Sequence, residues 1–247
     1  MILRVDDKGE RFPLTLTDWD RQKGTLTLVF QEVGVSTNKL GSLRVGDEIS
    51  DVLGPLGMPS EVKRFGLVCL VGGGVGAAFM YPIAKSLKEA GNKVVSIIAA
   101  KTAELVILED EMKEVSDEVC ISTDDGSRGY KGFACDAVQT LIKEGYSFDL
   151  VHVVGPAIMM RTVADVTKPY NIRTIASLNS IMVDGMGMCG ACRVTVGGQT
   201  KFACCDGPEF DAHKVDFDEL IKRQRVFIQE EKRALERWEK RRLASHE

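Results

Sequence analysis

The sequence is poor in aromatic residues and in histidine, and it lacks a basic excess. Phe, Trp and Tyr together make up 6% of the 247 residues, and only three residues are His. Lys and Arg number 32 against 36 Asp and Glu, which gives a net charge of −4. Proteins that bind nucleic acid normally carry a basic surplus. This composition therefore argues against a nucleic-acid partner.

Long hydrophobic runs are also missing. A membrane-spanning helix needs about 18 or more apolar residues in succession, and no segment approaches that length. The start, Met1-Ile2-Leu3-Arg4-Val5-Asp6-Asp7, carries charge where a signal peptide needs an apolar run. We therefore expect a cytoplasmic protein with no membrane contact. Its 44% hydrophobic and 28% charged residues are typical of a globular protein.

The cysteines do not suit a disulfide framework. There are seven, an odd number, and four of them fall between Cys189 and Cys205. A secreted framework distributes an even number of cysteines along the chain, whereas clustered thiols in a reducing compartment indicate metal ligands. The other three lie in or beside apolar runs and are expected in the core: Cys69, Cys120 and Cys135.

Apolar periodicity indicates an α/β plus β protein of four regions. Residues 1–60 show short strands, including 25–30, and no convincing helix, so we expect a partial β-barrel that lacks its first strands. Residues 61–179 alternate strands with helices, and the strands are apolar on both faces. This pattern predicts a parallel five-stranded sheet with helices on both faces. The expected strands are 67–71, 94–98, 119–122, 150–154 and 174–177, and the expected helices are 77–90, 133–144 and 157–167.

The last two regions differ from the sheet. Residues 180–215 are dense in Gly, Met and Cys, whereas residues 216–247 predict one C-terminal helix. Leu220, Phe227 and Ala234 repeat every seven residues, and Trp238 extends the stripe. Such a stripe fits a helix that packs on its own domain or one that reaches a partner subunit.

A glycine-rich turn separates the first strand of the expected sheet from its first helix. The segment Gly72-Gly73-Gly74-Val75-Gly76-Ala77 matches G-x-G-x-x-A. Glycines here let backbone N–H groups approach a pyrophosphate at a helix N-terminus. We therefore expect nucleotide binding at Gly73, Gly74 and Gly76.

The ribose contact is expected elsewhere than usual. The second strand ends at Lys101 without the acid that usually binds ribose. Asp124 and Asp125 follow the third strand and would accept ribose hydroxyls and repel a 2′-phosphate, which favours NAD over NADP. The same residues also suit a plain turn. Gly155 and Pro156, after the fourth strand, fit either a helix start or a wall of a nicotinamide pocket.

The most specific pattern is the loop Asp184-Gly185-Met186-Gly187-Met188-Cys189-Gly190-Ala191-Cys192, followed by Cys204-Cys205. Thiolates in a glycine-rich loop favour an iron–sulfur cluster. A [2Fe–2S] cluster needs a fourth ligand, and the Asp184 carboxylate can supply it. The alternative is a structural zinc ion completed by a further Cys or by His213, which would make the chain a non-enzymatic interaction module.

These motifs resemble the iron–sulfur flavoprotein branch of the ferredoxin–NADP reductase family. This branch includes the electron-transfer subunit of dihydroorotate dehydrogenase and the small subunit of NADH-dependent reduced ferredoxin:NADP oxidoreductase. The family pattern C-G-x-G-x-C-x2-C followed by C-x-D-G-P is similar to 184–192 and 204–208. The resemblance implies Asp184, Cys189, Cys192 and Cys204 as cluster ligands, with aspartate replacing the first cysteine as in the oxidoreductase subunit.

The resemblance also implies FAD on residues 1–60 and NAD(H) on residues 61–179. Pro13, Leu14 and Thr15 are similar to the segment that contacts the isoalloxazine, although Arg11 lies one place further from the hydroxyl residue than usual. Gly34-Val35-Ser36-Thr37 is similar to the turn that binds the FAD pyrophosphate.

The implied function is electron transfer from NADH through FAD and a [2Fe–2S] cluster, without a catalytic acid–base pair. The implied partner is a larger subunit with its own FAD and [4Fe–4S] clusters, and ferredoxin is reached through the complex. A subunit of dihydroorotate dehydrogenase and a subunit of a sulfide or polysulfide reductase are the alternatives within the resemblance.

Overall fold

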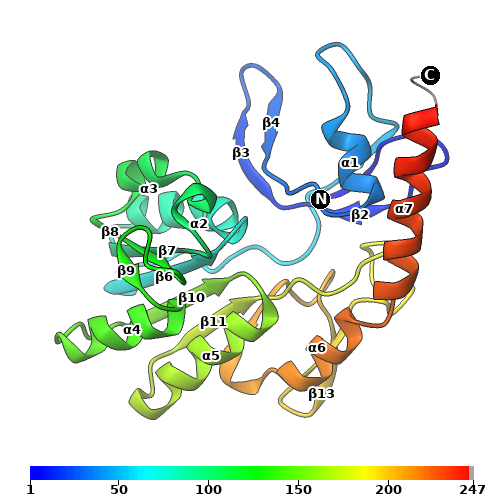
Figure 1. The fold of residues 1–247 in the computed structure, drawn as a ribbon. Helices are drawn as coiled ribbons and strands as arrows, with labels where there is room; N and C mark the ends of the chain where they lie inside the picture. The colour runs from blue at the N-terminus through cyan, green and yellow to red at the C-terminus, as the bar shows by residue number, and fades with distance from the viewer. Residues whose placement is uncertain (245–247) are drawn as a thin grey trace.

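The structure is a computed structural model that describes residues 1–244, and the statements below refer to these residues. Figure 1 shows an N-terminal lobe beside a sheet domain, with the cysteine-rich region and two C-terminal helices completing the chain. None of the helices in residues 1–244 combines the length with the hydrophobicity that a membrane span requires.

The N-terminal lobe contains two separate antiparallel sheets. The first has the order β2-β1-β5, and the second is the hairpin of β3 and β4. A partial barrel therefore stays a prediction. The bounds are β1 (Ile2–Arg4), β2 (Phe12–Pro13), β3 (Leu16–Asp20), β4 (Thr25–Leu28) and β5 (Asp51–Leu53).

The expectation of no helix in this lobe is wrong, because α1 spans Val35–Gly41. Seven residues are too few to show a helical period, and none of them is buried. A local device stabilises the helix start instead. The Thr37 hydroxyl accepts hydrogen bonds from the backbone N–H groups of Val33 and Gly34.

The sheet domain has seven strands in the order β14-β11-β10-β6-β7-β8-β9. The five strands that the sequence predicts are present and parallel. The count of five is too low because β9 has two residues and β14 has three, which is too short for a pattern. The bounds are β6 (Leu67–Gly73), β7 (Lys93–Ala100), β8 (Glu118–Thr123), β9 (Tyr130–Lys131), β10 (Leu150–Val154), β11 (Thr174–Ser177) and β14 (Glu209–Asp211).

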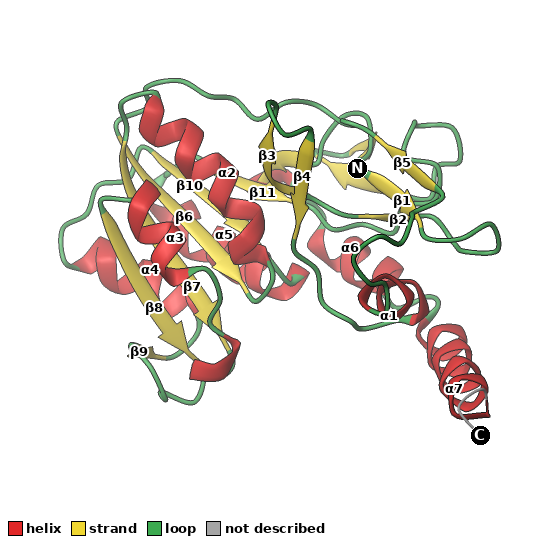
Figure 2. Ribbon diagram, turned by 90° about the horizontal axis from the view of Figure 1, so that it is seen from above, coloured by secondary structure: helices red, strands yellow, loops and turns green. Residues whose placement is uncertain are grey.

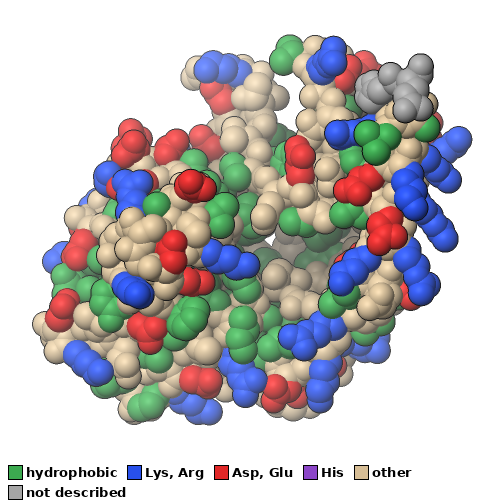
Figure 3. All heavy atoms as spheres, in the orientation of Figure 1, with side chains coloured by type: hydrophobic (Ala, Val, Ile, Leu, Met, Phe, Trp, Pro, Cys, Tyr) green, Lys and Arg blue, Asp and Glu red, His purple; other side chains and the backbone are tan. Residues whose placement is uncertain are grey.

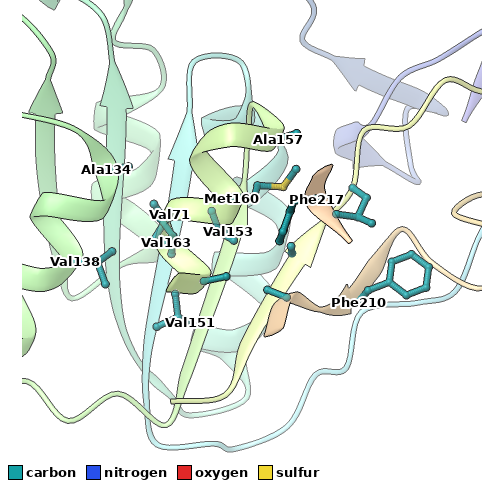
Figure 4. Close-up of a cluster of buried hydrophobic side chains, with 14 of the residues drawn as sticks. Val71, Ala134, Val138, Val151, Val153, Ala157, Met160, Val163, Phe210 and Phe217 are labelled. Carbon is teal, nitrogen blue, oxygen red and sulfur yellow. The ribbon is translucent and has the colours of Figure 1, made fainter. Parts of the chain in front are cut away.

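Helices cover both faces of this sheet, as predicted (Figure 1). Alternate residues of β6 explain the two cores: Val68 and Leu70 pack on one face, whereas Cys69 and Val71 pack on the other. Helices α2 (Gly76–Glu89) and α3 (Glu109–Val115) cover the first face, and α4 (Ala134–Lys143) and α5 (Ala157–Thr167) cover the second. Figure 4 shows Val71, Val151 and Val153 of the sheet near side chains of α5. Short 3-10 turns occur at Ala103–Leu105, Lys168–Tyr170 and Ala212–Lys214.

The C-terminal region contains two helices, so the prediction of one continuous helix is wrong. The hairpin of β12 (Arg193–Val196) and β13 (Gln199–Phe202) leads to α6 (Phe217–Gln224) and then to α7 (Ile228–Ala244). Leu220 of α6 is buried in the same core as Cys192 and Cys204.

Helix α6 packs into the core and α7 does not, so the apolar side chains that repeat every seven residues do not form one continuous buried stripe. Helix α7 has no buried residue, and Phe227 before it is half exposed. Figure 2 shows α7 extending away from the sheet domain, beside α1. The predicted helix also included residues 245–247, which lie outside the described residues.

Candidate functional site

A large cavity lies between the N-terminal lobe, the carboxyl ends of the parallel strands and the cysteine-rich region. Its volume is about 2210 Å³. Ligand pockets usually have volumes of about 300–1,000 Å³, so this cavity has room for two nucleotide-sized ligands. The space-filling view in Figure 3 shows the molecule hollowed between the two lobes.

The cavity brings together residues that the sequence analysis selected separately. Those that line it are Pro13, Leu14, Thr15, Gly73, Gly74, Gly76, Asp124, Gly155, Pro156 and Cys204. The selected residues outside its wall are Arg11, Gly34, Ser36, Thr37, Asp125, Asp184, Cys189 and Cys192. The common edge of parallel strands explains the first group, because loops after β6, β8 and β10 meet there.

The glycine-rich turn is tight enough to require glycine. A Cβ on Gly76 would lie 2.4 Å from the carbonyl oxygen of Val154, and Gly74 has a positive φ of 57°. These glycines therefore let α2 start directly against β10. No side chain among residues 1–244 caps the N-terminus of α2. The N–H groups of Ala77 and Ala78 donate to the carbonyls of Gly74 and Val75, at 3.1 and 3.0 Å, which leaves the N–H of Gly76 available to an anion in the cavity.

The two aspartates after β8 have different environments. The Asp125 carboxylate accepts hydrogen bonds from the backbone N–H and hydroxyl of Ser127, at 2.9 and 2.6 Å. These bonds lower the pKa of Asp125, whose carboxylate therefore serves the turn. Asp124 lines the cavity with Lys101, and its carboxylate has no hydrogen-bond or ion-pair partner among residues 1–244. The ribose prediction thus rests on Asp124.

Of the residues predicted to bind FAD, some line the cavity and others form hydrogen bonds within a local turn. Leu14 of the Pro13–Thr15 segment is held at the cavity wall by the chain start, because its N–H donates to the carbonyl of Met1 at 3.0 Å. The hydroxyl of Thr37 is used within its own turn, where it donates to the carbonyl of Gly34.

Several cavity residues were not predicted from the sequence, and Ser180 is the most informative of them. Ser180 lines the cavity and is 6% exposed, and its buried hydroxyl has no hydrogen-bond partner among residues 1–244. A buried hydroxyl without a partner costs about 1–3 kcal/mol, and a polar ligand atom in the cavity would remove that cost. Trp19, Ser177 and Glu209 also line the cavity. Of these residues, only Ser177 was indicated by the sequence, because it ends the predicted strand 174–177.

The cluster loop arranges its donors as two pairs. The Sγ atoms of Cys192 and Cys204 are 3.2 Å apart and buried. The Asp184 carboxylate accepts the N–H of Met186 at 2.8 Å and the N–H of Cys189 at 2.6 Å. The hydrogen bond from Met186 contributes most to lowering the pKa of Asp184, so this carboxylate is ionised at neutral pH.

The surroundings of Cys204, in contrast, raise the pKa of its thiol. Burial is the largest cause, and Cys192 and Cys205 add to it, raising the pKa of Cys204 to about 12. A metal must therefore displace a proton from this thiol. Cys205 is exposed, and its sulfur lies 3.7 Å from the sulfur of Cys204 and against Gly187.

The arrangement does not suit the zinc alternative. The Nε2 atom of His213 lies 3.0 Å from the hydroxyl of Thr167, which makes this imidazole a partner of α5. Among residues 1–244, no three His, Cys, Asp or Glu side chains gather to hold one metal ion. Structural zinc needs four donors around one ion, whereas a [2Fe–2S] cluster divides its ligands between two irons. Two donor pairs fit the dinuclear cluster.

Several proteins with similar sequences are named as electron-transfer subunits or as homologs of one. Residues 179–216 match the family model described as the iron–sulfur cluster binding domain of dihydroorotate dehydrogenase B. A Thermotoga maritima protein named as a homolog of the electron-transfer subunit of dihydroorotate dehydrogenase B is 50% identical, over 96% of this chain and 84% of its own length. The electron-transfer subunit of a Geobacillus strain is 36% identical, over 83% of this chain and 79% of its own length.

One solved structure is similar to this chain in sequence and fold, and a second is similar in fold alone. The structure of an NADH-dependent reduced ferredoxin-NADP oxidoreductase, described for flavin-based electron bifurcation, has a chain that matches with a TM-score of 0.90 and 48% identity. The match covers 96% of this chain and 85% of that one. An Amycolatopsis cytochrome P450 reductase matches with a TM-score of 0.58 and 21% identity, over 69% of this chain and 56% of that one, which shows a shared fold.

Proposed function

Since this chain belongs to the family of iron–sulfur electron-transfer subunits that includes that of dihydroorotate dehydrogenase B, we propose that it passes electrons between NADH, FAD, a [2Fe–2S] cluster and a larger partner subunit. One observation carries the proposal. The cavity that holds the nucleotide turn is also lined by Cys204, whose sulfur lies 3.2 Å from that of Cys192. A cofactor in the cavity would therefore lie directly against a cluster ligand.

Each region of the chain has a cofactor in this proposal. Residues 1–60 hold FAD, with Pro13, Leu14 and Thr15 at the cavity wall and the Gly34–Thr37 turn outside it. Residues 61–179 hold NAD(H), residues 180–215 hold the cluster, and residues 216–247 form the C-terminal region. FAD supplies the conversion between two-electron and one-electron chemistry when bound. The residues of this chain bind and orient the cofactors, and no acid–base pair is needed.

The donor pairs suggest how the cluster is held. Cys192 and Cys204 would bind one iron, and Asp184 and Cys189 would bind the other. The N–H groups of Met186 and Cys189 orient the carboxylate before any metal binds. Because Cys192 and Cys204 are buried in the core, they would exclude water from one side of a cluster bound there.

The partner is proposed from the relatives. The 48% identical structure, which covers 96% of this chain, supports a larger subunit of a ferredoxin- and NADP-linked, electron-bifurcating transhydrogenase. Such a subunit would carry its own FAD and [4Fe–4S] clusters, with ferredoxin reached through the complex. The 36% identical Geobacillus subunit supports a second candidate, electron transfer to a dihydroorotate dehydrogenase.

Anaerobic purification of the native complex tests the proposal. We expect about one flavin and two irons for each copy of this chain beyond those of the partner, together with bleaching of the visible spectrum by NADH. Mass spectrometry of the co-purified chain distinguishes the two candidate partners. A colourless protein that contains zinc would contradict the proposal.

A further inference from the structure

The cavity-lining residues at the carboxyl edge of the sheet form a row whose order follows the strands. From β8 through β7, β6 and β10 to β11, the row contains Asp124, Lys101, Gly74, Gly155 and Ser177. Neighbouring strands are about 4.8 Å apart, so the row spans about 19 Å. In the proposed function the diphosphate lies at Gly74 and a ribose at Asp124. The nicotinamide end of the dinucleotide then lies toward β11.

An unusual polar group stands at that end of the row. Glu209 begins β14 and pairs directly with Ser177 of β11, so their side chains share one face. The hydroxyl of Ser60, from the segment that joins the two lobes, donates a hydrogen bond to Oε1 of Glu209. His152 of β10 shares this face, and its Nε2 lies 3.0 Å from the hydroxyl of Ser177 and 3.8 Å from Oε1 of Glu209.

Among residues 1–244, no positively charged side chain forms an ion pair with the Glu209 carboxylate. Burial lowers the pKa of His152, so the imidazole next to Glu209 is neutral at neutral pH. In the described part of the chain, no Lys or Arg forms an ion pair with Glu209, and its Oε2 has no hydrogen-bond partner. The side chain is only 20% exposed and lines the cavity. A carboxylate so placed is stabilised by a ligand that brings a positive charge.

We propose that Glu209, held by Ser60 and backed by Ser177 and His152, determines which oxidation state of the nicotinamide the cavity prefers. The oxidised nicotinamide ring carries one positive charge and the reduced ring carries none. The Glu209 carboxylate attracts the oxidised ring by its charge, whereas a hydrogen bond to the carboxamide would serve both forms equally. Glu209 is thus a residue that determines specificity for the oxidised over the reduced nicotinamide. This inference rests on the proposed function.

Ligand titration of the oxidised holoprotein in its native complex tests this role. The two ligands are NAD⁺ and 1,4,5,6-tetrahydro-NAD, a neutral analogue that cannot transfer a hydride. We expect Glu209→Gln to weaken NAD⁺ binding about tenfold or more and to change binding of the neutral analogue by less than about twofold. Glu209→Asp keeps the charge and should keep the preference for NAD⁺ even if both ligands bind more weakly.

Glu104→Gln is the matched control, because Glu104 lines the same cavity beyond β7, toward the opposite end of the row. The ratio of the two dissociation constants should not change in this variant. Equal weakening of both ligands by Glu209→Gln, or no change in either, would overturn the inference. A shifted flavin midpoint potential with an unchanged ligand ratio would also overturn it, because Glu209 would then face the flavin. If the parent protein binds neither ligand, the proposed function itself fails.

Discussion

Asp184 and Cys205 are the residues of the cluster loop whose individual roles are most open to experiment. Both Asp184 oxygens already accept backbone N–H groups, and each keeps a lone pair for a metal. Cys205 lies beside Cys204 but is exposed and packs on Gly187. Substitutions at these two residues therefore distinguish a side chain that binds the cluster from one that only lies next to a cluster ligand.

We expect Asp184→Cys to keep a [2Fe–2S] cluster with a shifted midpoint potential, because thiolate shares more electron density with iron than carboxylate does. Asp184→Ala should leave an iron position open and make the cluster labile. Cys204→Ser should damage or remove the cluster, whereas Cys205→Ser should be nearly silent. Electron paramagnetic resonance and iron analysis check all four variants. A parent-like spectrum for Asp184→Ala, together with iron loss in Cys205→Ser, would show that the ligands are wrongly assigned.

The nucleotide preference is a second prediction at the scale of residues. Asp124→Ser should narrow the preference for NAD⁺ over NADP⁺ roughly tenfold, because a carboxylate that binds ribose hydroxyls and repels a 2′-phosphate is removed. Asp125→Ser is the control, since its carboxylate is engaged by Ser127. Dissociation constants for both nucleotides check this. If Asp125→Ser changes the preference and Asp124→Ser does not, the assignment from cavity geometry fails.

His152 gives a prediction about pH. Its folded pKa is lowered by burial, so below its ordinary value of about 6.5 the unfolded chain binds a proton that the folded chain does not. Stability should therefore be lost as the pH falls from about 6.5 toward the folded pKa, with a slope of up to about 1.4 kcal/mol per pH unit. Denaturant unfolding of the parent and of His152→Gln between about pH 5 and 7 checks it. Parallel curves for the two proteins would contradict it.

At the scale of elements, α6 and α7 differ in what they contribute. Helix α6 buries Leu220 to 1% exposure, and its Arg223 donates to the carbonyl of Ala191 in the cluster loop at 2.9 Å. Helix α7 buries nothing, and exposed apolar side chains occur before and along it at Phe227, Ile228 and Leu243. In Figure 3, basic side chains follow the outer edge where α7 runs. Helix α6 therefore belongs to the core, and α7 is available to a partner.

Two truncations test this difference. Ending the chain after Arg225 should weaken association with the larger subunit and leave the cofactors bound, because none of residues 226–244 is buried. Ending it after Asp218 also removes Leu220, and loss of a buried leucine costs about 2–5 kcal/mol. Sedimentation and cofactor content check both chains. Cluster loss in the first truncation would show that α7 supports the fold.

At the scale of the whole molecule, the cavity depends on contacts between regions far apart in the sequence. The N–H of Met58 donates to the carbonyl of Gly207 at 2.7 Å, and Ser60 donates to Glu209. A Cβ on Gly185 in the cluster loop would lie 2.7 Å from the side chain of Ile2 in β1. The segment between the lobes thus connects the N-terminal lobe to the cysteine-rich region, and the cavity forms where the regions meet.

The local features of this protein are encoded in short stretches of its sequence. Five parallel strands and three helices of the sheet domain were predictable, because burial on both faces leaves an apolar run that can be read locally. The glycine-rich turn and the cysteine-rich loop were predictable for a related reason, since their spacing reflects chemistry within a few residues. Short elements were missed: α1 and β14 are too brief to show a period.

Contacts between distant side chains, in contrast, depend on the three-dimensional fold. The fold places Asp124 at the cavity and Asp125 in a turn, and it brings His213 to Thr167. It also divides the C-terminal region into α6, which contributes Phe217 and Leu220 to the core, and α7, which has no buried residue. The fold also brings Glu209 of β14 next to Ser177 of β11, His152 of β10 and Ser60 of the segment that joins the lobes. Strand order and pairing bring these groups together across up to 149 positions of chain, and no pattern of neighbouring residues encodes a contact over that separation.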